Sequence, residues 1–349
     1  MRSPSVPVDI DLDIGEGLPP RARLLASLHR AGRPVSGERL ARELGVSRAA
    51  VNKHIRALRG LGYRIAGTPG RGYLLARRPD RLFPYELLLE GLAPQVKRVV
   101  YRSAVGSTND LARALGEAGA SAPAVVLADY QSAGRGRRGR SWVAPPNTSV
   151  LLSLLIRPAV APGQVPLFSL LAALAAAEAL EELCGVCARV KWPNDVLLNG
   201  KKCGGVLVEM AGEAETVRHV VIGVGINVSQ SAAQLPRDAR QAATSVRLAC
   251  GRAPRRARIA VEVVNRIVAC EGGRRLPDDL LLRWRARDVC LGARVAVAAP
   301  EGRVEGVGEA VDELGRLVVR RADGARVTCL AGDVTVLGVG RGMSRRGKR

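Results

Sequence analysis

The sequence predicts an α/β (α+β) chain of several domains: a helix-turn-helix with a wing, a central α/β domain and a small β-barrel. Three patterns support this prediction: helical periodicity followed by two short strands, then alternating strands and helices, then short strands between tight turns. The 349 residues exceed what one hydrophobic core organises. A content of 47% hydrophobic and 25% charged residues excludes collagen-like, coiled-coil and wholly disordered chains.

The first helix runs from Pro20 to about Gly32, with leucines on one face. Ser36 and Ser47 are expected to cap a short second helix and a longer third helix, which are separated by a glycine-containing turn. Two short strands around the turn at 68–72 then form the wing. A short helix, a tight turn and a longer helix are typical of a helix-turn-helix.

This module is basic on its outer side. Residues 47–79 include eight Lys or Arg and no acid, which suits phosphate binding. Short polar or guanidinium groups near the start of a recognition helix suit base edges. The candidate DNA-binding residues are Ser47, Arg48 and Asn52 for bases, and Lys53, Arg56 and Arg71 for phosphates. The alternative is a three-helix interaction module with a merely basic surface.

The middle of the chain alternates strands and helices. Strands are expected at 96–103, 124–131, 149–156, within 188–210 and at 217–228, and helices at 108–119, 167–183, 257–270 and 278–288. This order predicts an α/β domain. Short strands at 291–338, broken by turns, predict the barrel. The expected segments are a disordered tail (1–18), the winged helix-turn-helix (19–79), a linker (80–97) with a short helix within 80–92, the catalytic domain (98–290), the barrel (291–340) and a basic tail (341–349).

Charge and hydropathy restrict the partners. The net charge of +22 favours anionic partners without specifying one. The longest apolar run, 167–177, is too short to span a bilayer, and the start lacks the plan of a signal peptide. We therefore expect a soluble, cytoplasmic protein with no membrane partner.

The seven cysteines are scattered and odd in number, which argues against a disulfide framework. Cys184 and Cys187 have the spacing of a C-x-x-C pair, but no second pair of Cys or His completes a zinc site. A thioredoxin-like redox pair stays an alternative. We favour two small apolar residues at the end of the helix 167–183.

The most conspicuous segment is the loop 131–140, QSAGRGRRGR. It contains G-x-G-x-x-G, formally a dinucleotide fingerprint, but Pro145 and another strand follow, and no acid occurs until Glu178. What remains is a glycine-rich strap whose amides and arginines suit an anion such as a phosphate. Its arginines are Arg135, Arg137, Arg138 and Arg140. A nucleic-acid-binding RG segment is the alternative, but such segments are longer and do not lie between two apolar strands.

Other polar groups flank the strap in sequence. The segment KWPND at 191–195 is a turn by composition, and Lys202 begins a strand whose glycine pair allows close approach. Asn227 ends the strand GVGIN, and the segment 107–109, Ser-Thr-Asn, precedes a helix that it also caps. A lysine at the mouth of an apolar pocket is a point charge for a carboxylate or phosphate.

Ser-Thr-Asn, GRGRRGRSW, KWPND, KKCGGVLVE and GVGIN, in this order and spacing, resemble the motifs of a biotin–protein ligase. The helix-turn-helix makes the chain similar to the bifunctional BirA type, which is ligase and biotin-operon repressor in one chain. The resemblance covers about residues 20–338. It implies a winged helix-turn-helix, a class-II-synthetase-like catalytic domain and an SH3-like barrel. Cys203 stands where the family usually has an aliphatic residue.

The resemblance implies an ATP-dependent ligase that forms biotinyl-5′-AMP and transfers biotin to a lysine. The acceptor would be the biotin carboxyl carrier domain of acetyl-CoA carboxylase or a related carboxylase. Biotin and ATP would be substrates, Mg²⁺ would come with ATP, and the adenylate would be intermediate and corepressor. Operator DNA and a ligand-dependent homodimer are the further implied partners.

The resemblance also implies roles for residues. The catalytic set would be Lys202, Arg135 and Arg137. Biotin would contact Ser107, Thr108, Asn109, Gln131, Gly134, Arg135, Gly136, Arg137 and Lys202, with the first four at its ureido end. ATP would contact Arg138, Arg140, Trp142, Asn194, Asp195 and Asn227, and no residue is expected to hold a resident metal. Three alternatives stay open: a lipoate–protein ligase, a ligand-sensing transcription factor without turnover, and a ligase whose helix-turn-helix has lost its operator.

Overall fold

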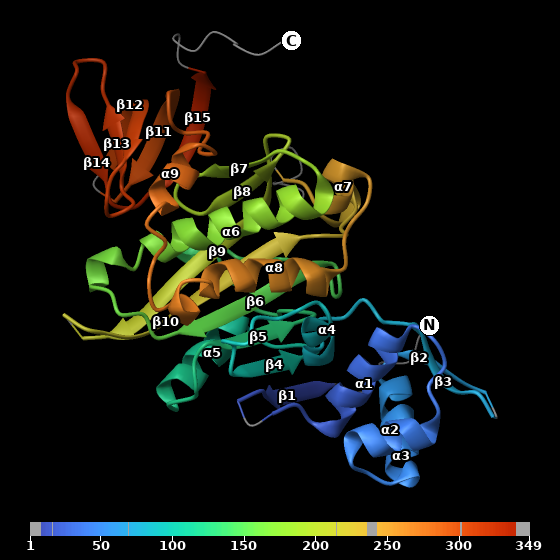
Figure 1. Ribbon diagram of the computed structural model, residues 1–349. Helices are drawn as coiled ribbons and strands as arrows, with labels where there is room; N and C mark the ends of the chain where they lie inside the picture. Colours follow the sequence, from blue (N-terminus) through green and yellow to red (C-terminus); the bar gives the residue numbers. More distant parts are fainter. Residues whose placement is uncertain are drawn as a thin grey trace.

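The computed structural model describes residues 8–339, except residues 16, 69, 214, 236–242 and 301. A helical module lies at one end, a large mixed sheet with helices in the middle and a small β-domain at the other end (Figure 1). Within the described residues, no helix is long and apolar enough to cross a membrane.

The predicted winged helix-turn-helix is confirmed. It consists of α1 (Pro20–Ala31), α2 (Gly37–Leu44) and α3 (Arg48–Gly60), followed by the wing strands β2 (Arg64–Thr68) and β3 (Gly72–Arg77). The Ser36 and Ser47 hydroxyls accept hydrogen bonds from the amides of Arg39 and Ala50, which caps α2 and α3 as expected. Leu24, Leu28 and Ile55 are almost fully buried in the small core between the helices.

The central sheet has eight strands in the order β1-β4-β5-β6-β10-β9-β8-β7. Their bounds are β1 (Asp9–Asp13), β4 (Arg98–Arg102), β5 (Ala124–Ala128), β6 (Ser149–Ile156), β7 (Ala188–Lys191), β8 (Asp195–Leu198), β9 (Lys201–Gly212) and β10 (Val217–Asn227). The β4–β5 pair is parallel and its neighbours in the sheet are antiparallel. The expected strands are therefore present, and because they pair in both directions this part is α+β.

Helices cover both faces of this sheet. The helices α6 (Leu167–Cys184) and α8 (Arg256–Val268) pack side by side on one face (Figure 1). The helix α5 (Thr108–Glu117) packs on the other face, against a smaller apolar cluster that includes Val126 and Leu155. Period-2 alternation along β5 and β6 supplies apolar side chains to both clusters.

One boundary prediction was wrong. Residues 9–13, expected within a disordered tail, form β1 at the edge of the central sheet, because Leu12 is buried and Asp11 pairs with Arg102 of β4. Residues 1–7 and 16 of that tail lie outside the described residues. The stretch 80–97 contains the short helix expected there, α4 (Pro84–Leu89), whose Glu86 is fully buried.

Glu86 explains why that stretch is ordered. Its carboxylate pairs with Arg78, which follows the wing, and with Arg255 at the start of α8. A buried carboxylate needs such partners, so the connection between the two domains is a packed junction.

The remaining strands form the predicted small β-domain. Five strands pair in the order β14-β13-β12-β11-β15, with bounds β11 (Ala293–Ala299), β12 (Gly302–Val311), β13 (Leu317–Arg320), β14 (Arg326–Cys329) and β15 (Asp333–Val339). Two short helices, α7 (Val246–Cys250) and α9 (Leu280–Arg285), lie before it in the chain. The Trp192 indole donates to the carbonyl of Gly315 at 2.8 Å, which joins this domain to the central one. The tail 341–349 lies outside the described residues.

Candidate functional site

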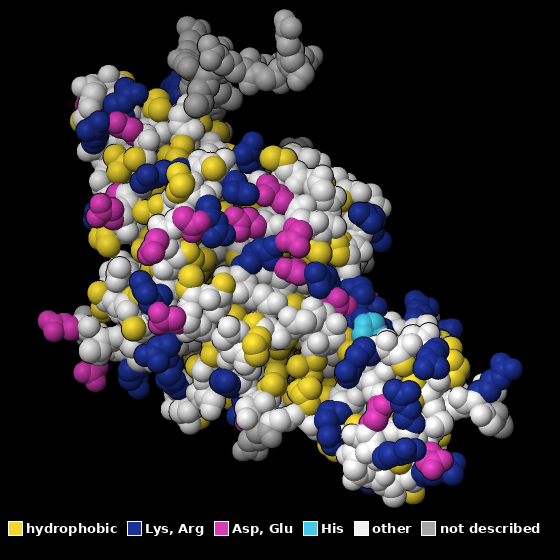
Figure 2. All heavy atoms as spheres, in the orientation of Figure 1, with side chains coloured by type: hydrophobic (Ala, Val, Ile, Leu, Met, Phe, Trp, Pro, Cys, Tyr) yellow, Lys and Arg dark blue, Asp and Glu magenta, His cyan; other side chains and the backbone are white. Residues whose placement is uncertain are grey.

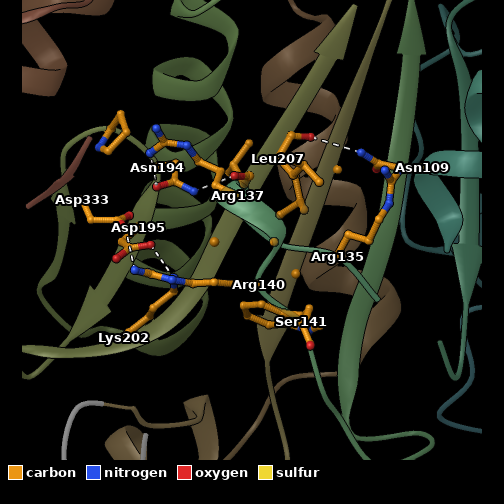
Figure 3. A pocket seen from close by; sticks show the side chains of 18 of the residues that line it. Asn109, Arg135, Arg137, Arg140, Ser141, Asn194, Asp195, Lys202, Leu207 and Asp333 are labelled. Carbon is orange, nitrogen blue, oxygen red and sulfur yellow. Dashed lines mark hydrogen bonds and ion pairs between the residues drawn. The ribbon is translucent and has the colours of Figure 1, made fainter. Parts of the chain in front are cut away.

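A cavity of about 350 Å³ lies over the strands β6, β9 and β10, between the strap and the β-domain. Figure 3 shows Asn109 and Arg135 on one side of it and Lys202, Asp195 and Arg140 on the other. The predicted residues that line it are Ser107, Thr108, Asn109, Gln131, Arg135, Gly136, Arg137, Arg140, Trp142, Asn194, Asp195 and Lys202. The structure thus brings together all five motifs, with the glycines of GVGIN forming part of the wall.

One end of the cavity is lined mainly by uncharged polar side chains, with Arg135 at its edge in an ion pair with Glu209. The Gln131 side-chain oxygen accepts from the Thr108 amide at 2.7 Å and from the Thr108 hydroxyl at 2.9 Å. The Ser153 hydroxyl lies 2.8 Å from the Thr108 oxygen and 2.6 Å from the Asn109 side-chain oxygen. Ser153 comes from the middle of β6 and is fully buried. This end can bind a neutral group rich in donors and acceptors.

The other end carries most of the cations that line the cavity. The Lys202 ammonium lies 2.6 Å from an oxygen of Asp195, and the Lys191 ammonium lies 3.2 Å from the other oxygen. Arg137 donates to the Asn194 side-chain oxygen at 3.3 Å, and burial lowers the pKa of its guanidinium. These cations line the cavity, where an anionic ligand could contact them.

The strap is anchored on the β-domain. Arg138 donates to the Ala298 carbonyl at 2.6 Å, and Arg140 pairs with Asp333 at 2.5 Å. Arg137 also donates to the Gly332 carbonyl at 3.4 Å. The cavity is therefore closed on one side by contacts between the central domain and the β-domain (Figure 3).

Two glycines of β10 are needed for the shape of the cavity. A Cβ at Gly225 would lie 2.7 Å from the Trp142 ring, and one at Gly223 would lie 2.2 Å from the Asn109 side-chain oxygen. Any larger residue would displace these side chains. The glycines in GVGIN therefore serve close approach.

Three predicted site residues do not line the cavity. Gly134 packs against the Trp142 carbonyl, and Arg138 points to the β-domain. Asn227 is buried outside the cavity lining. Asn227 donates to the Thr244 carbonyl at 3.2 Å and accepts from Gln230 at 2.9 Å. In this structure, its amide supports the segment around Thr244.

The sequence analysis missed several residues of the site. Ser153 and Asp333 stand in stretches with no motif. Packing of α5 on β6 places Ser153 against Thr108, which lines the cavity, and packing of the β-domain brings Asp333 to the cavity wall. Glu209 ends the KKCGGVLVE motif and Lys191 begins KWPND, so motif position is the sequence signal for both residues. Glu209 accepts from Arg135 and Asn109.

The candidate DNA-binding residues lie on the helix-turn-helix and its wing, in the part of the surface where Figure 2 shows several Lys and Arg side chains. Arg48, Lys53, Arg56 and Arg71 are exposed. Ser47 caps α3, and the Asn52 side-chain oxygen accepts from the Tyr73 hydroxyl at 2.5 Å. Asn52 therefore also fixes the wing against the recognition helix.

The cysteines agree with the interpretation favoured above. Cys184 ends α6, Cys187 is exposed, and neither forms a disulfide. Burial raises the pKa of the Cys184 thiol to about 11, whereas a reactive redox thiol has a lowered pKa. In the described part of the chain, no group of three or more His, Cys, Asp or Glu side chains is placed to hold a metal ion.

Comparison with family models finds three matches. Residues 21–74 match a model described as HTH domain, residues 102–227 one described as Biotin/lipoate A/B protein ligase family, and residues 290–337 one described as Biotin protein ligase C terminal domain. These segments agree with the three folded parts of the structure.

Comparison with curated proteins finds relatives along most of the chain. The chain is 34% identical over 316 residues to the Bifunctional ligase/repressor BirA of Bacillus subtilis, covering 88% of this chain and 95% of the relative. It is 39% identical over 197 residues to the protein of the same name from Escherichia coli, covering 56% and 59%. Among solved structures, Biotin protein ligase from Aquifex aeolicus in complex with biotin and ATP aligns with a TM-score of 0.59 and 27% identity, covering 69% of this chain and 98% of that one.

Proposed function

Because this chain belongs to the biotin–protein ligase family of the bifunctional ligase/repressor type, we propose that it activates biotin with ATP and attaches it to a lysine. The activated form is biotinyl-5′-AMP. The acceptor is the biotin carboxyl carrier domain of acetyl-CoA carboxylase or a related carboxylase. The same chain acts as a biotin-responsive repressor through its winged helix-turn-helix.

The observation that carries the ligase proposal is the polarity of the cavity. Its neutral end, built on Thr108, Gln131 and Ser153, suits a ureido group, which both donates and accepts hydrogen bonds. Its cationic end, at Lys202 and Arg137, suits a carboxylate next to a phosphate. Biotin carries a ureido group at one end and a carboxylate at the other, and ATP supplies the phosphate. A lipoyl dithiolane ring has no strong hydrogen-bonding groups to match these side chains, which argues against the lipoate alternative.

The first step joins two anions, so charge is the obstacle. A biotin carboxylate oxygen attacks the α-phosphorus of ATP, forms an O–P bond and displaces pyrophosphate. We assign Lys202 to the carboxylate and α-phosphate, and Arg135, Gly136 and Arg137 to the linkage between them. Asp195 holds the Lys202 ammonium at 2.6 Å, so the charge is already in place before substrates bind. Arg140, Trp142 and Asn194 are assigned to the nucleotide.

The second step forms an amide. The carrier lysine, as a free amine, attacks the carbonyl carbon of the adenylate, AMP leaves and the amine loses a proton. The support for a protected adenylate is the contact of the strap with the β-domain, at Ala298 and Asp333. Such a cover excludes water, which would otherwise hydrolyse the reactive anhydride.

In this proposal Mg²⁺ arrives with ATP. The acids that line the cavity, Asp195 and Asp333, are each paired with basic side chains, which does not suit a resident metal site. When bound, the ion neutralises phosphate charge. Phosphate oxygens would supply most of its ligands, with Asn194 or Asp195 as the side chains that would contact it.

The proposal extends to regulation. The adenylate acts as corepressor, favours a homodimer through the central domain and so brings two helix-turn-helix modules to a two-fold operator. The exposed cations on α3 and the wing support DNA binding at that end of the molecule. A cytoplasmic location, where carboxylases and operator DNA are found together, completes the proposal.

A pyrophosphate-release assay with Mg-ATP tests the ligase proposal. Biotin, lipoate and octanoate are compared, each with and without a biotin carboxyl carrier domain, and the carrier is analysed by mass spectrometry. We expect release with biotin alone and one added biotin on the carrier. Release with lipoate and none with biotin would contradict the proposal. Tight biotin binding without release would favour the transcription factor without turnover.

A further inference from the structure

Glu209 lies just beyond the cavity and has no role in the steps above. The alternation of β9 places Gly205, Leu207 and Glu209 on one face, and the first two line the cavity. One oxygen of the Glu209 carboxylate accepts from the Asn109 side-chain nitrogen at 2.6 Å and from Arg135 at 3.1 Å. A single carboxylate thus joins the start of α5 to the strap.

This contact determines which way the Asn109 amide points. The Asn109 nitrogen donates to Glu209 and, at 3.3 Å, to the Leu207 carbonyl, while its oxygen accepts from the Ser153 hydroxyl. The reversed amide would place its oxygen against two acceptors. Because an ionised carboxylate only accepts, Glu209 fixes the orientation that the other partners also favour.

The orientation of Asn109 then affects the neutral end of the cavity. The Ser153 hydroxyl has one proton for two nearby acceptors, the oxygens of Asn109 and Thr108. With the observed orientation of the Asn109 amide, the Asn109 oxygen competes with the Thr108 oxygen for that proton. With the reversed amide, Ser153 would accept from Asn109 and give its proton to Thr108. The pattern of donors and acceptors that Thr108 and Gln131 offer to a ligand would change.

We infer that Glu209 is a positioning residue for biotin, holding Asn109 and Arg135 in the arrangement that binds it. The inference rests on the proposed function, because it concerns the same cavity. Arg135 has a second partner, Asp110 at 2.8 Å, so it keeps one ion pair when Glu209 is replaced. Asn109 keeps only its weaker hydrogen bond to Leu207 on that side. Replacement of Glu209 should therefore weaken biotin binding without affecting the ATP end.

The test compares Glu209→Ala and Glu209→Gln with Glu213→Ala, a control at an exposed position beyond the end of the same strand. Biotin affinity is measured by titration calorimetry, and KM for biotin, KM for ATP and kcat are measured by pyrophosphate release. We expect Glu209→Ala to raise the biotin dissociation constant about 10-fold, the effect of removing one charge-assisted hydrogen bond. KM for ATP and kcat at saturating biotin should change less than about 3-fold, because Arg135 keeps its ion pair with Asp110.

Glu209→Gln retains an acceptor for Asn109 and should recover part of the biotin affinity, which a merely structural role would not require. Thermal unfolding of each variant separates this effect from misfolding. Unchanged biotin affinity in Glu209→Ala, or an equal loss for biotin and ATP, would overturn the inference while the ligase proposal stands. A wild-type chain that releases no pyrophosphate with biotin would overturn both.

Discussion

Lys202 lies at the cationic end of the cavity, with its ammonium held by Asp195, while the neighbouring Lys201 is exposed. We predict that Lys202→Ala slows adenylation by roughly 10²–10³-fold, the usual effect of removing one preorganised charge. Folding should be retained, because the Lys202 side chain is 39% exposed and contributes little to the core. Pyrophosphate release and thermal unfolding measure the two effects.

Lys201→Ala is the matched control for that experiment and should behave like the wild type. A large loss of activity in Lys201→Ala together with a near-normal Lys202→Ala would mean that the role belongs to Lys201. Motif position in the sequence distinguishes Lys202 from Lys201, and the ion pair of Lys202 with Asp195 gives this choice a physical basis.

A second residue-scale prediction concerns Gly225. The Gly225→Ala Cβ would lie 2.7 Å from the Trp142 ring, closer than carbon atoms approach without displacement. We expect the ring to move and the ATP dissociation constant to rise about 10-fold or more, because Trp142 is assigned to the nucleotide and inserting a methyl group into packed surroundings has a cost of this size. Titration calorimetry with ATP checks this. Normal affinity would show that the Trp142 ring is free to adjust.

At the scale of elements, the strap has few apolar contacts and several glycines, so its closed form depends on a small number of polar contacts with the β-domain. We predict rapid hydrogen exchange of the amides 134–140 in the free protein and slow exchange with biotin and ATP bound. Arg137→Ala should then increase the biotin dissociation rate more than it reduces the association rate. Equal exchange in the free and bound protein would contradict this account.

The strand β1 gives a second prediction at this scale. Asp11 pairs with Arg102 and lies 3.8 Å from Arg98, so Asp11→Arg would place like charges across the β1–β4 pair. We expect faster hydrogen exchange in β1 and in the β4 amides that face it, because cross-strand like charges destabilise a sheet edge. The double variant Asp11→Arg with Arg102→Asp restores opposite charges between these two positions and should recover part of the slow exchange, since the new arginine lies near Arg98 and the new aspartate near Asp9. No change in the single variant would mean that Leu12 and the backbone pairing hold the strand without this ion pair.

At the scale of the whole molecule, the winged module is joined to the central domain on both sides, by β1 before it and by the Glu86 junction after it. We predict that specific DNA binding needs a dimer and increases with biotin and ATP. Thermodynamic reciprocity requires operator DNA to strengthen the dimer by the same factor. Sedimentation and DNA-binding titrations, each with and without ligands, measure the two sides.

Substitutions on this module should separate base reading from phosphate binding. Arg48→Ala should reduce discrimination between DNA sequences, whereas Lys53→Ala or Arg56→Ala should weaken all binding and reduce the salt slope by about one unit for each phosphate that is no longer neutralised. Asn52→Ala should have a mixed effect, because the Asn52 side chain also holds the Tyr73 hydroxyl of the wing. If biotin-synthesis promoters and the chain's own upstream region bind no better than random DNA under any condition, the repressor role is wrong.

The sequence by itself determined the local structure and most of the chemistry. Capping serines, period-2 strands and glycine turns act over a few residues, so α2, α3 and the wing could be predicted closely. The five motifs likewise identified most of the residues that line the cavity. Their composition restricts the chemistry, since lysine, arginine and small polar groups bind anions and neutral polar groups.

Only the tertiary structure decided which distant residues meet. Asp333 reaches the strap because the β-domain packs on the central one, and Ser153 reaches Thr108 because β6 passes beneath α5. The acidic stretch at 9–13 looked like a tail because its alternation is short and its arginine partners lie about ninety residues away. Asn227 looked like a ligand contact, yet its neighbours use its hydrogen bonds. Contacts of this kind depend on packing and strand pairing between remote segments, whose partners a local pattern does not specify.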